Sequence, residues 1–239
     1  MAISVHELMV IDANTKALVD SAELTVVGRL VDASNATLLC SISDELQVIY
    51  KPIAGERPLW DFPDGDLASR EVAAYYISAV GDFNLVPYTV LRDGPFGKGS
   101  VQHWIDSDES IDLAAFGQSD DEQLRSLALL DAVLNNTDRK FGHLLVTDAG
   151  RLFGCDHGVT LHADPKLRTV LWQWSGDHLT QAELDQLEKL RTNLDEVYLS
   201  ELISAPEIEA LHSRISSLIY DARMPLPSDE WPAVPWPPF

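Results

Sequence analysis

The chain has 239 residues, enough for one domain or a pair of small lobes around a substantial core. Its 38 acidic and 17 basic residues give a formal net charge of −21, and such a surface repels nucleic acid and anionic membranes. No apolar run approaches the ~18 residues that span a bilayer, which excludes membrane insertion. The N-terminus lacks a basic head followed by an apolar core, so we expect a cytoplasmic protein. Two cysteines, Cys40 and Cys155, are too few for a disulfide framework.

The first half of the chain predicts an antiparallel sheet with one helix. Residues 1–21 are weakly patterned, and we expect a short helix or an N-terminal arm there. Apolar runs bounded by turn residues predict strands at Leu24–Val31, Thr37–Ser41, Leu46–Ile53, Leu85–Leu91 and Gly99–Ile105. Between the third and fourth strands, apolar residues at helical spacing predict an amphipathic helix, Ser69–Val80.

The second half predicts a mainly helical region. An acidic linker, Asp106–Asp121, precedes an apolar helix over Leu124–Leu134. Two short strands follow, His143–Val146 and Arg151–Cys155, and then helices near Gln181–Leu190 and Glu207–Ala222. The last stretch, Pro225–Phe239, is too rich in proline for a helix, and its aromatic residues indicate that it packs back onto the protein.

Two acids surround the predicted hairpin. Asp138 lies in the polar loop after the apolar helix, and Asp156 lies just past the second strand, before Gly158. A helix, a loop with an acid, a hairpin and a second acid form the layout of a kinase-type phosphoryl-transfer centre. In that layout the first Asp accepts the acceptor hydroxyl's proton, while the second Asp and a residue five positions after the first hold the metal. Here that residue is His143.

The sequence Asp138-Arg139-Lys140-Phe141-Gly142-His143 resembles the D-R-H-x-x-N motif of phosphatidylinositol 3-/4-kinases and their atypical kinase relatives. The stretches YKP, PLWDFP, SREVAAYY, VLRDGPFGKGSVQ, NNTDRKFGHLL and DHGVTLH are similar to an actinobacterial phosphatidylinositol 3-/4-kinase-like family, over roughly residues 24–239. The resemblance implies an α+β, two-lobed, protein-kinase-like fold. Residues 1–21 would form an N-terminal arm, 22–105 the small nucleotide-binding lobe and hinge, and 106–239 the large catalytic lobe.

Two departures from the motif bear on mechanism. Lys140 replaces the His of D-R-H, and His143 replaces the metal-binding Asn. Magnesium prefers oxygen ligands, whereas imidazole suits transition metals, so His143 leaves both Mg²⁺ and Mn²⁺ open. Arg139 has two interpretations: it balances negative charge near the reacting phosphoryl group, or it pairs with a nearby acid.

The resemblance also assigns nucleotide contacts. Lys51, at the end of the third strand, would bind the α- and β-phosphates, and Glu71 on the following helix would orient it. The alternative for Lys51 is simple exposure at a strand end. Ser34 and Asn35, in the first turn, are candidate phosphate contacts or an ordinary hairpin turn. In the strand that enters the large lobe, the backbone at Gln102, His103 and Trp104 is the candidate adenine-reading hinge.

The region after Gly158 holds the acceptor in kinases, and here it contains Lys166 and Arg168. These two bases would grip an anionic group on the acceptor, or pair with surface acids. We therefore expect an ATP-dependent phosphotransferase acting on an unidentified soluble acceptor. The alternatives are a nucleotide-binding pseudokinase and a nucleotidyl transferase. The lipid substrate of the lipid kinases is not carried over, because the charge disfavours anionic membranes.

Overall fold

The computed structural model of residues 1–239 describes residues 11–30, 35–44, 46–63 and 65–239. The chain forms two compact units. Unit 1 comprises residues 1–57 and 88–104, and unit 2 comprises residues 58–87 and 105–239. The chain passes into unit 2 next to the lobe boundary predicted at residue 105. The segment 58–87, which the sequence division placed with the sheet, belongs to unit 2.

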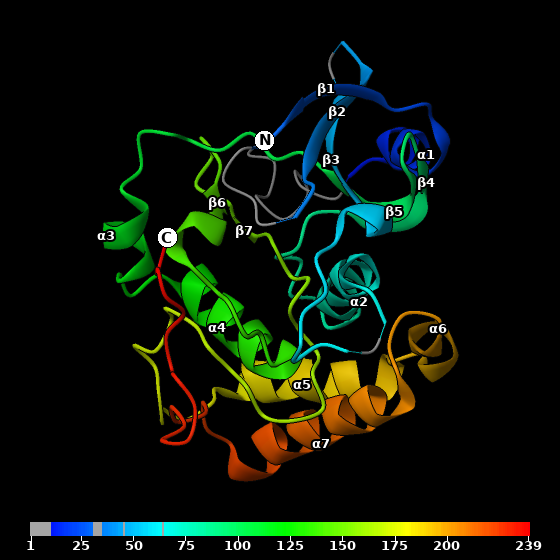
Figure 1. Ribbon diagram of the computed structural model, residues 1–239. Coiled ribbons are helices and arrows are strands. Elements are labelled where there is room, and N and C mark those ends of the chain that lie inside the picture. Colours follow the sequence, from blue (N-terminus) through cyan, green and yellow to red (C-terminus); the bar gives the residue numbers. More distant parts are fainter. Residues whose placement is uncertain (1–10, 31–34, 45, 64) are drawn as a thin grey trace. The chain divides into compact units, whose positions relative to one another are not determined.

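Unit 1 is an antiparallel five-stranded sheet with the order β1-β2-β3-β5-β4 (Figure 1). Its strands are β1 Thr25–Arg29, β2 Leu38–Ser43, β3 Leu46–Pro52, β4 Thr89–Gly94 and β5 Gly97–His103. The core side chains Cys40, Val48, Tyr50 and Val101 are fully buried. A short 3₁₀ turn, η2 Ile53–Gly55, follows β3.

The helix α1 Ala13–Ser21 occupies the weakly patterned N-terminal stretch. Asp12 caps it by accepting hydrogen bonds from the amides of Asn14 and Thr15. Arg92 of β4 fixes its other end by donating to the carbonyl oxygens of Val19 at 2.7 Å and Ala22 at 2.6 Å. The helix is therefore attached to the sheet through β4.

The β4–β5 hairpin differs from its prediction at both ends. The strand begins at Thr89 rather than Leu85, because the carbonyl oxygen of Leu85 accepts a hydrogen bond from Gly154 of unit 2 at 2.7 Å. The ladder then continues to the Gly94–Gly97 pair, which leaves only Pro95 and Phe96 in the turn. The turn was predicted to be longer because its glycines are usually loop residues.

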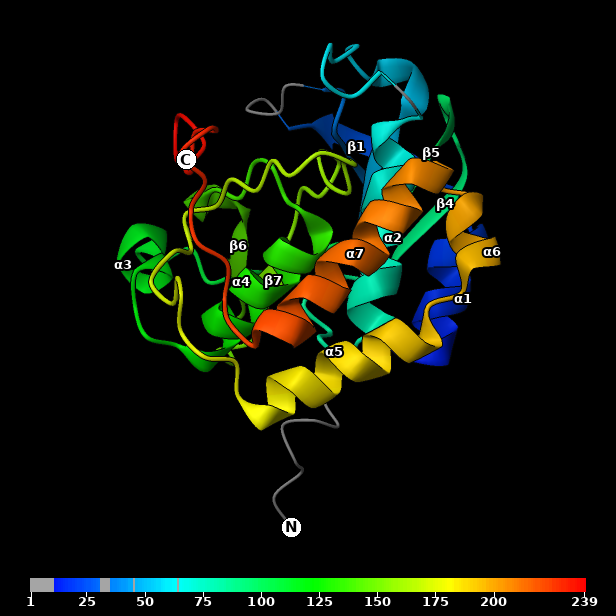
Figure 2. The same ribbon diagram turned by 90° about the horizontal axis from the view of Figure 1, so that it is seen from below.

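Unit 2 is built from helices and one small hairpin. Its elements are α2 Leu67–Val80, α3 Leu113–Gly117, α4 Glu122–Leu134, the 3₁₀ turn η3 Phe141–His143, β6 Leu144–Val146, β7 Leu152–Gly154, α5 Gln181–Asn193, α6 Glu196–Ser200 and α7 Ala205–Asp221. Figures 1 and 2 show α5 and α7 lying side by side. The core side chains Leu127, Leu130, Leu187, Leu211 and Ile215 are fully buried.

Two short helices were not predicted. The helix α3 lies in the expected acidic linker, and α6 lies between the two predicted C-terminal helices. Each is five residues long and begins after an aspartate cap, Asp112 or Asp195, whose carboxylate accepts two backbone N–H groups. Helices of this length carry too few apolar repeats to be recognised by periodicity. No helix among the described residues is long and apolar enough to cross a membrane.

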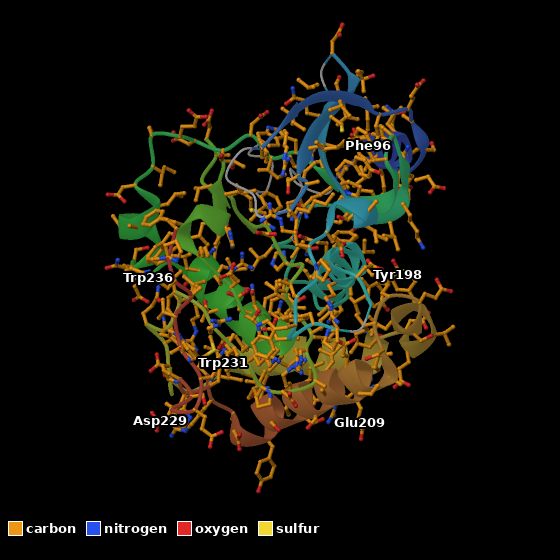
Figure 3. All side chains as sticks on the ribbon, in the orientation of Figure 1. Phe96, Tyr198, Glu209, Asp229, Trp231 and Trp236 are labelled. Carbon is orange, nitrogen blue, oxygen red and sulfur yellow. The ribbon has the colours of Figure 1, made fainter. Side chains whose placement is uncertain are left out.

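The C-terminal segment, residues 225–239, packs onto unit 2 as its aromatic content predicts. The carbonyl oxygen of Ala233 accepts hydrogen bonds from Thr169 at 3.1 Å and from the indole of Trp172 at 2.8 Å. The amide of Phe141 donates to Pro238 at 2.9 Å. Figure 3 labels Trp231 and Trp236 on this segment.

Candidate active site

The candidate site is built on the loop that follows α4. The helix ends at Asn135, which adopts a left-handed conformation with φ 50°. Its side-chain amide donates to His162 and Asp164 at 3.0 and 2.7 Å, and its side-chain oxygen accepts from the amide of Lys166 at 2.8 Å. The short polar side chain that ends the helix therefore fixes the facing loop 162–166 as well.

Arg139 connects this loop to the hairpin. The side chain is 0% exposed and forms an ion pair with the equally buried Asp131 of α4, at 2.9 Å. Its guanidinium also donates to the carbonyl oxygen of Cys155 at 2.9 Å and lies 2.6 Å from His157 Nε2. A fully buried guanidinium is closed to a solvent-borne substrate. The expected direct role beside the phosphoryl group is therefore corrected to the ion-pair role, which positions the residues on either side.

Asp138 precedes this anchor and keeps a side chain that is 33% exposed. Its carboxylate lies 3.2 Å from Lys140 Nζ. Partial burial raises the pKa of Asp138 above the usual aspartate value, the Lys140 cation opposes the rise, and the Asp156 charge adds to it. A carboxylate with a raised pKa is a stronger base once it is ionised, which suits proton abstraction.

Asp156 and His143 come together at the end of the hairpin. His143 Nε2 lies 3.5 Å from Asp156 Oδ2, and Asp156 has a left-handed backbone with φ 59°. The Asp156 side chain is 54% exposed, whereas that of His143 is 15% exposed. An aspartate held in this unfavourable backbone conformation, with an accessible carboxylate, is typical of functional positions.

These donors fit a divalent metal that is completed by other ligands. The described residues contain no group of three or more His, Cys, Asp or Glu side chains that could hold a metal. Asp156 and His143 offer one carboxylate and one imidazole, so phosphate oxygens or water would have to supply the remaining positions. That is the arrangement used for metal-bound nucleotides rather than for structural metal sites.

The helix α2 packs against the segment after Asp156. A Cβ placed on Gly158 would lie 3.2 Å from Leu67 Cβ and 3.7 Å from Glu71 Oε1, so the glycine permits a close approach. Glu71 is 2% exposed. The neighbouring Arg70 pairs with Glu207 of α7 at 2.6 Å, with both side chains at most 8% exposed. Glu71 is therefore fixed beside the Asp156-His157-Gly158 segment.

The other predicted nucleotide contacts belong to unit 1. Lys51 is half-buried on β3, opposite Ser100 of β5. Asn35 accepts a hydrogen bond from the amide of Arg57 at 2.9 Å through its side-chain oxygen, and Ser34 lies outside the described residues.

Of the predicted hinge residues, Gln102 and His103 belong to β5 and Trp104 directly follows it. The Gln102 side chain is buried and donates to Thr89 at 2.8 Å. The amides of His103 and Trp104 donate to the carbonyl oxygens of Tyr88 and Gln47. Both amides are thus already hydrogen-bonded within unit 1, so a nucleotide base would have to be bound by other backbone atoms.

Lys166 and Arg168 lie next to the loop 135–139 that follows α4. The amide of Arg168 donates to the carbonyl oxygen of Asn136 at 2.8 Å, and the amide of Arg139 donates to the carbonyl oxygen of Arg168 at 3.1 Å. Lys166 Nζ lies 5.5 Å from the ring centre of Trp231, and the Arg168 guanidinium lies 4.9 Å from it. Unit 2 therefore brings together Asp138, His143, Asp156, Lys166 and Arg168.

Two positioning residues, Asp131 and His157, were not identified from the sequence. A signal for Asp131 exists, because it is an acid within the apolar helix Leu124–Leu134 and must find a buried partner. Its partner, Arg139, follows eight residues later. The sequence gives no comparable signal for His157, whose contact with Arg139 depends on the fold of the hairpin.

Comparison with known proteins gives one sequence relative and several structural ones. No family model matches the chain. Protein Rv2133c of Mycobacterium tuberculosis (strain ATCC 25618 / H37Rv) is 41% identical over 265 residues, covering 93% of this chain and 95% of the relative.

Several solved structures are similar to the chain, and two of the three compared below are kinases by their printed names. Hydra Fam20 with sugar has a TM-score of 0.61 and 13% identity, covering 92% of this chain and 91% of that one. The Golgi casein kinase with Mn/ADP bound has a TM-score of 0.59 and 12% identity, with coverages of 87% and 74%. The Helicobacter pylori proinflammatory kinase CtkA has a TM-score of 0.50 and 12% identity, with coverages of 86% and 94%.

At these identities the structural matches show the fold, which confirms the α+β protein-kinase-like prediction. The sequence relative shows the family. The chain belongs to the family of Protein Rv2133c and has a protein-kinase-like fold, with an antiparallel five-stranded sheet and a helical C-terminal part.

Proposed function

We propose that the protein is an ATP-dependent phosphotransferase of the phosphatidylinositol 3-/4-kinase-like type, acting on an alcohol acceptor. The observation that carries the proposal is the arrangement of Asp138, Asp156 and His143 on one loop and the hairpin that follows it. Asp156 lies close enough to raise the pKa of Asp138, and it faces His143 at 3.5 Å. Acids in these two positions are what phosphoryl transfer requires: one for the hydroxyl proton and one for the phosphate-bound metal.

In this mechanism Asp138 accepts the proton of the acceptor hydroxyl as its oxygen attacks the γ-phosphorus. The bond between the γ-phosphorus and the bridging oxygen breaks, and ADP leaves. Asp156 and His143 would hold the metal, whose charge would offset that of the phosphate oxygens. Arg139 keeps Asp138 and the end of the hairpin in register through Asp131 and Cys155. We further propose that Lys51 of unit 1 binds phosphate.

Manganese is the metal that we expect at this site. One imidazole and one carboxylate form a mixed nitrogen and oxygen donor set, which transition metals bind better than magnesium does. The Golgi casein kinase, which shares the fold, was solved with Mn and ADP. That match supports the proposal that this chain also binds manganese together with an adenine nucleotide.

Calorimetric titration of the full chain with ATP and MnCl₂ tests the proposal. Asp156→Ala should weaken binding by about tenfold or more, because a contact to a charged group contributes ~1.5–3 kcal/mol. Asp138→Ala should leave binding nearly unchanged, since it acts on the acceptor. Asp148→Ala is the matched control, because this exposed acid lies on the same hairpin and carries the same charge. Absence of ATP binding with any metal, or equal binding by all four proteins, would contradict the proposal.

A pseudokinase is the second candidate, and His143 is the observation that favours it. An imidazole at the position of a metal-binding amide is a poor ligand for magnesium. A pseudokinase would show the same nucleotide binding and the same loss in Asp156→Ala, but no transfer. Only turnover separates the two functions.

A further inference from the structure

Two cations, Lys166 and Arg168, lie beside the loop that contains Asp138. The chain has 38 acidic residues, yet neither Lys166 nor Arg168 forms an ion pair with a carboxylate of the described residues. Aromatic rings surround them instead. Lys166 Nζ lies 5.9 Å from the ring centre of Trp60, 5.8 Å from Phe62 and 5.5 Å from Trp231. Aromatic faces attract cations without cancelling their charge for a third partner.

His162 adds a donor to this cluster. Its Nδ1 accepts a hydrogen bond from the amide of Asp164 at 2.9 Å, so the neutral ring carries its proton on Nε2. Lys166 Nζ lies 3.3 Å from that same Nε2. Two N–H groups cannot satisfy each other, so an acceptor group placed beside both would receive two hydrogen bonds.

Arg168 supplies a third donor. Its Nε is shielded from solvent and has no hydrogen-bond partner among the described residues. The guanidinium stacks on Trp231 with 4.9 Å between its central carbon and the ring centre. A buried donor without a partner carries a free-energy cost that a bound acceptor group would remove.

The backbone places these donors at the loop 135–139, which contains Asp138. Lys166 and Arg168 are fixed through their amides to Asn135 and Asn136, the residues just before Asp138. The charge of Arg168 also acts on Asp138. A molecule bound to this cluster would therefore have its neighbouring atoms near the Asp138 carboxylate.

We propose that the acceptor is a small hydroxylated molecule carrying a phosphate or carboxylate group, and that Lys166, His162 and Arg168 bind this group between Trp60 and Trp231. The proposal rests on the phosphotransfer function given above and specifies its substrate class. The donors recognise the anionic group, and Asp138 takes the proton of a hydroxyl on the same molecule. Trp60 is 85% exposed, so its side chain is available to cover the bound molecule.

The anion site is tested by titrating the full chain with inorganic phosphate in the absence of nucleotide. Tryptophan fluorescence is the readout of binding. Lys166→Met and Arg168→Met should each weaken binding by about tenfold or more. Arg168→Lys should recover part of the loss. Lys98→Met, at an exposed lysine on β5, is the charge-matched control and should bind like wild type. Circular dichroism of each variant checks that it is folded. Equal affinity in wild type, Lys166→Met and Arg168→Met, or no phosphate binding at all, would overturn the proposal.

The acceptor class is tested by ATP consumption with glycerol, glycerol 3-phosphate and glycerate. We expect acceleration by glycerol 3-phosphate or glycerate, lost in Lys166→Met, and none by glycerol. Acceleration by an acidic serine-containing peptide alone would overturn the small-molecule assignment. Nucleotide affinity separates the two proposals. If Lys166→Met weakens ATP binding itself, the cluster binds nucleotide phosphates and the acceptor site is wrong. If phosphate binds as expected but ATP does not bind, the phosphotransferase function fails and the anion site stands.

Discussion

Replacing Asp131 with alanine should destabilise unit 2 by about 3–5 kcal/mol, because it leaves the charge of Arg139 buried without a counterion. Both side chains are 0% exposed, and they meet at 2.9 Å. Asp131 also accepts hydrogen bonds from Asn136 at 2.8 Å and from Thr169 at 3.3 Å, so three buried groups lose a partner. The expected loss is a large fraction of the 5–15 kcal/mol that stabilises a typical native domain.

Urea unfolding followed by tryptophan fluorescence measures this loss. Five of the six tryptophans, all except Trp104, belong to unit 2, so the signal reports mainly on that unit. The control is Glu188→Ala, which breaks the Glu188–Arg191 pair on α5. Those two side chains meet at 2.6 Å but are 44% and 45% exposed, and the expected cost is below about 1 kcal/mol.

A double-mutant cycle with Arg139→Met completes the test. The loss in Asp131→Ala/Arg139→Met should be clearly smaller than the sum of the single losses, because the second change removes the uncompensated charge. The reasoning would be refuted if Asp131→Ala cost no more than Glu188→Ala. Additive losses would equally show that the two residues do not act as a pair.

Three further predictions concern the site itself. If Asp138 is the base, ATP turnover should rise with pH through the raised pKa of Asp138, since only its ionised form accepts a proton. Lys140→Ala should move this rise to higher pH, because the Lys140 cation lowers the pKa of Asp138. A pH profile that is unchanged in Lys140→Ala would exclude Asp138 as the base. His143→Asn should increase turnover with Mg²⁺ relative to Mn²⁺, and an unaltered metal preference in paired assays would place His143 outside the metal site. Lys51→Met should abolish ATP binding in calorimetry, whereas wild-type affinity would make Lys51 a surface residue.

Much of the fold follows from local sequence patterns. The helices α2, α4, α5 and α7 carry apolar stripes long enough to be recognised, and the strands are bounded by turn residues. The β4 strand was misplaced because Leu85 is apolar for a different reason: it packs within unit 2 and bonds to Gly154. Periodicity indicates burial but not the element against which a residue packs.

The site could be predicted only in part. Asp138, His143 and Asp156 could be proposed as site residues because their spacing around a hairpin matches a known chemistry, and the structure brings the three side chains close together. The buried role of Arg139 depends on Asp131 and His157, which lie in other elements and meet it only after folding. The His162–Lys166 donor pair was invisible for the same reason: a hydrogen-bond conflict exists only in three dimensions.

The most direct test of the central claim is transfer of the γ-phosphate by the full chain with Mn²⁺, in the presence of a pool of small metabolites. Wild type should consume ATP and label an acceptor. Asp138→Ala should bind ATP equally well and lose about 100-fold or more in turnover, the usual contribution of a general base. Equal ATP consumption by wild type and Asp138→Ala with every acceptor and metal would contradict the phosphotransferase account and favour a pseudokinase.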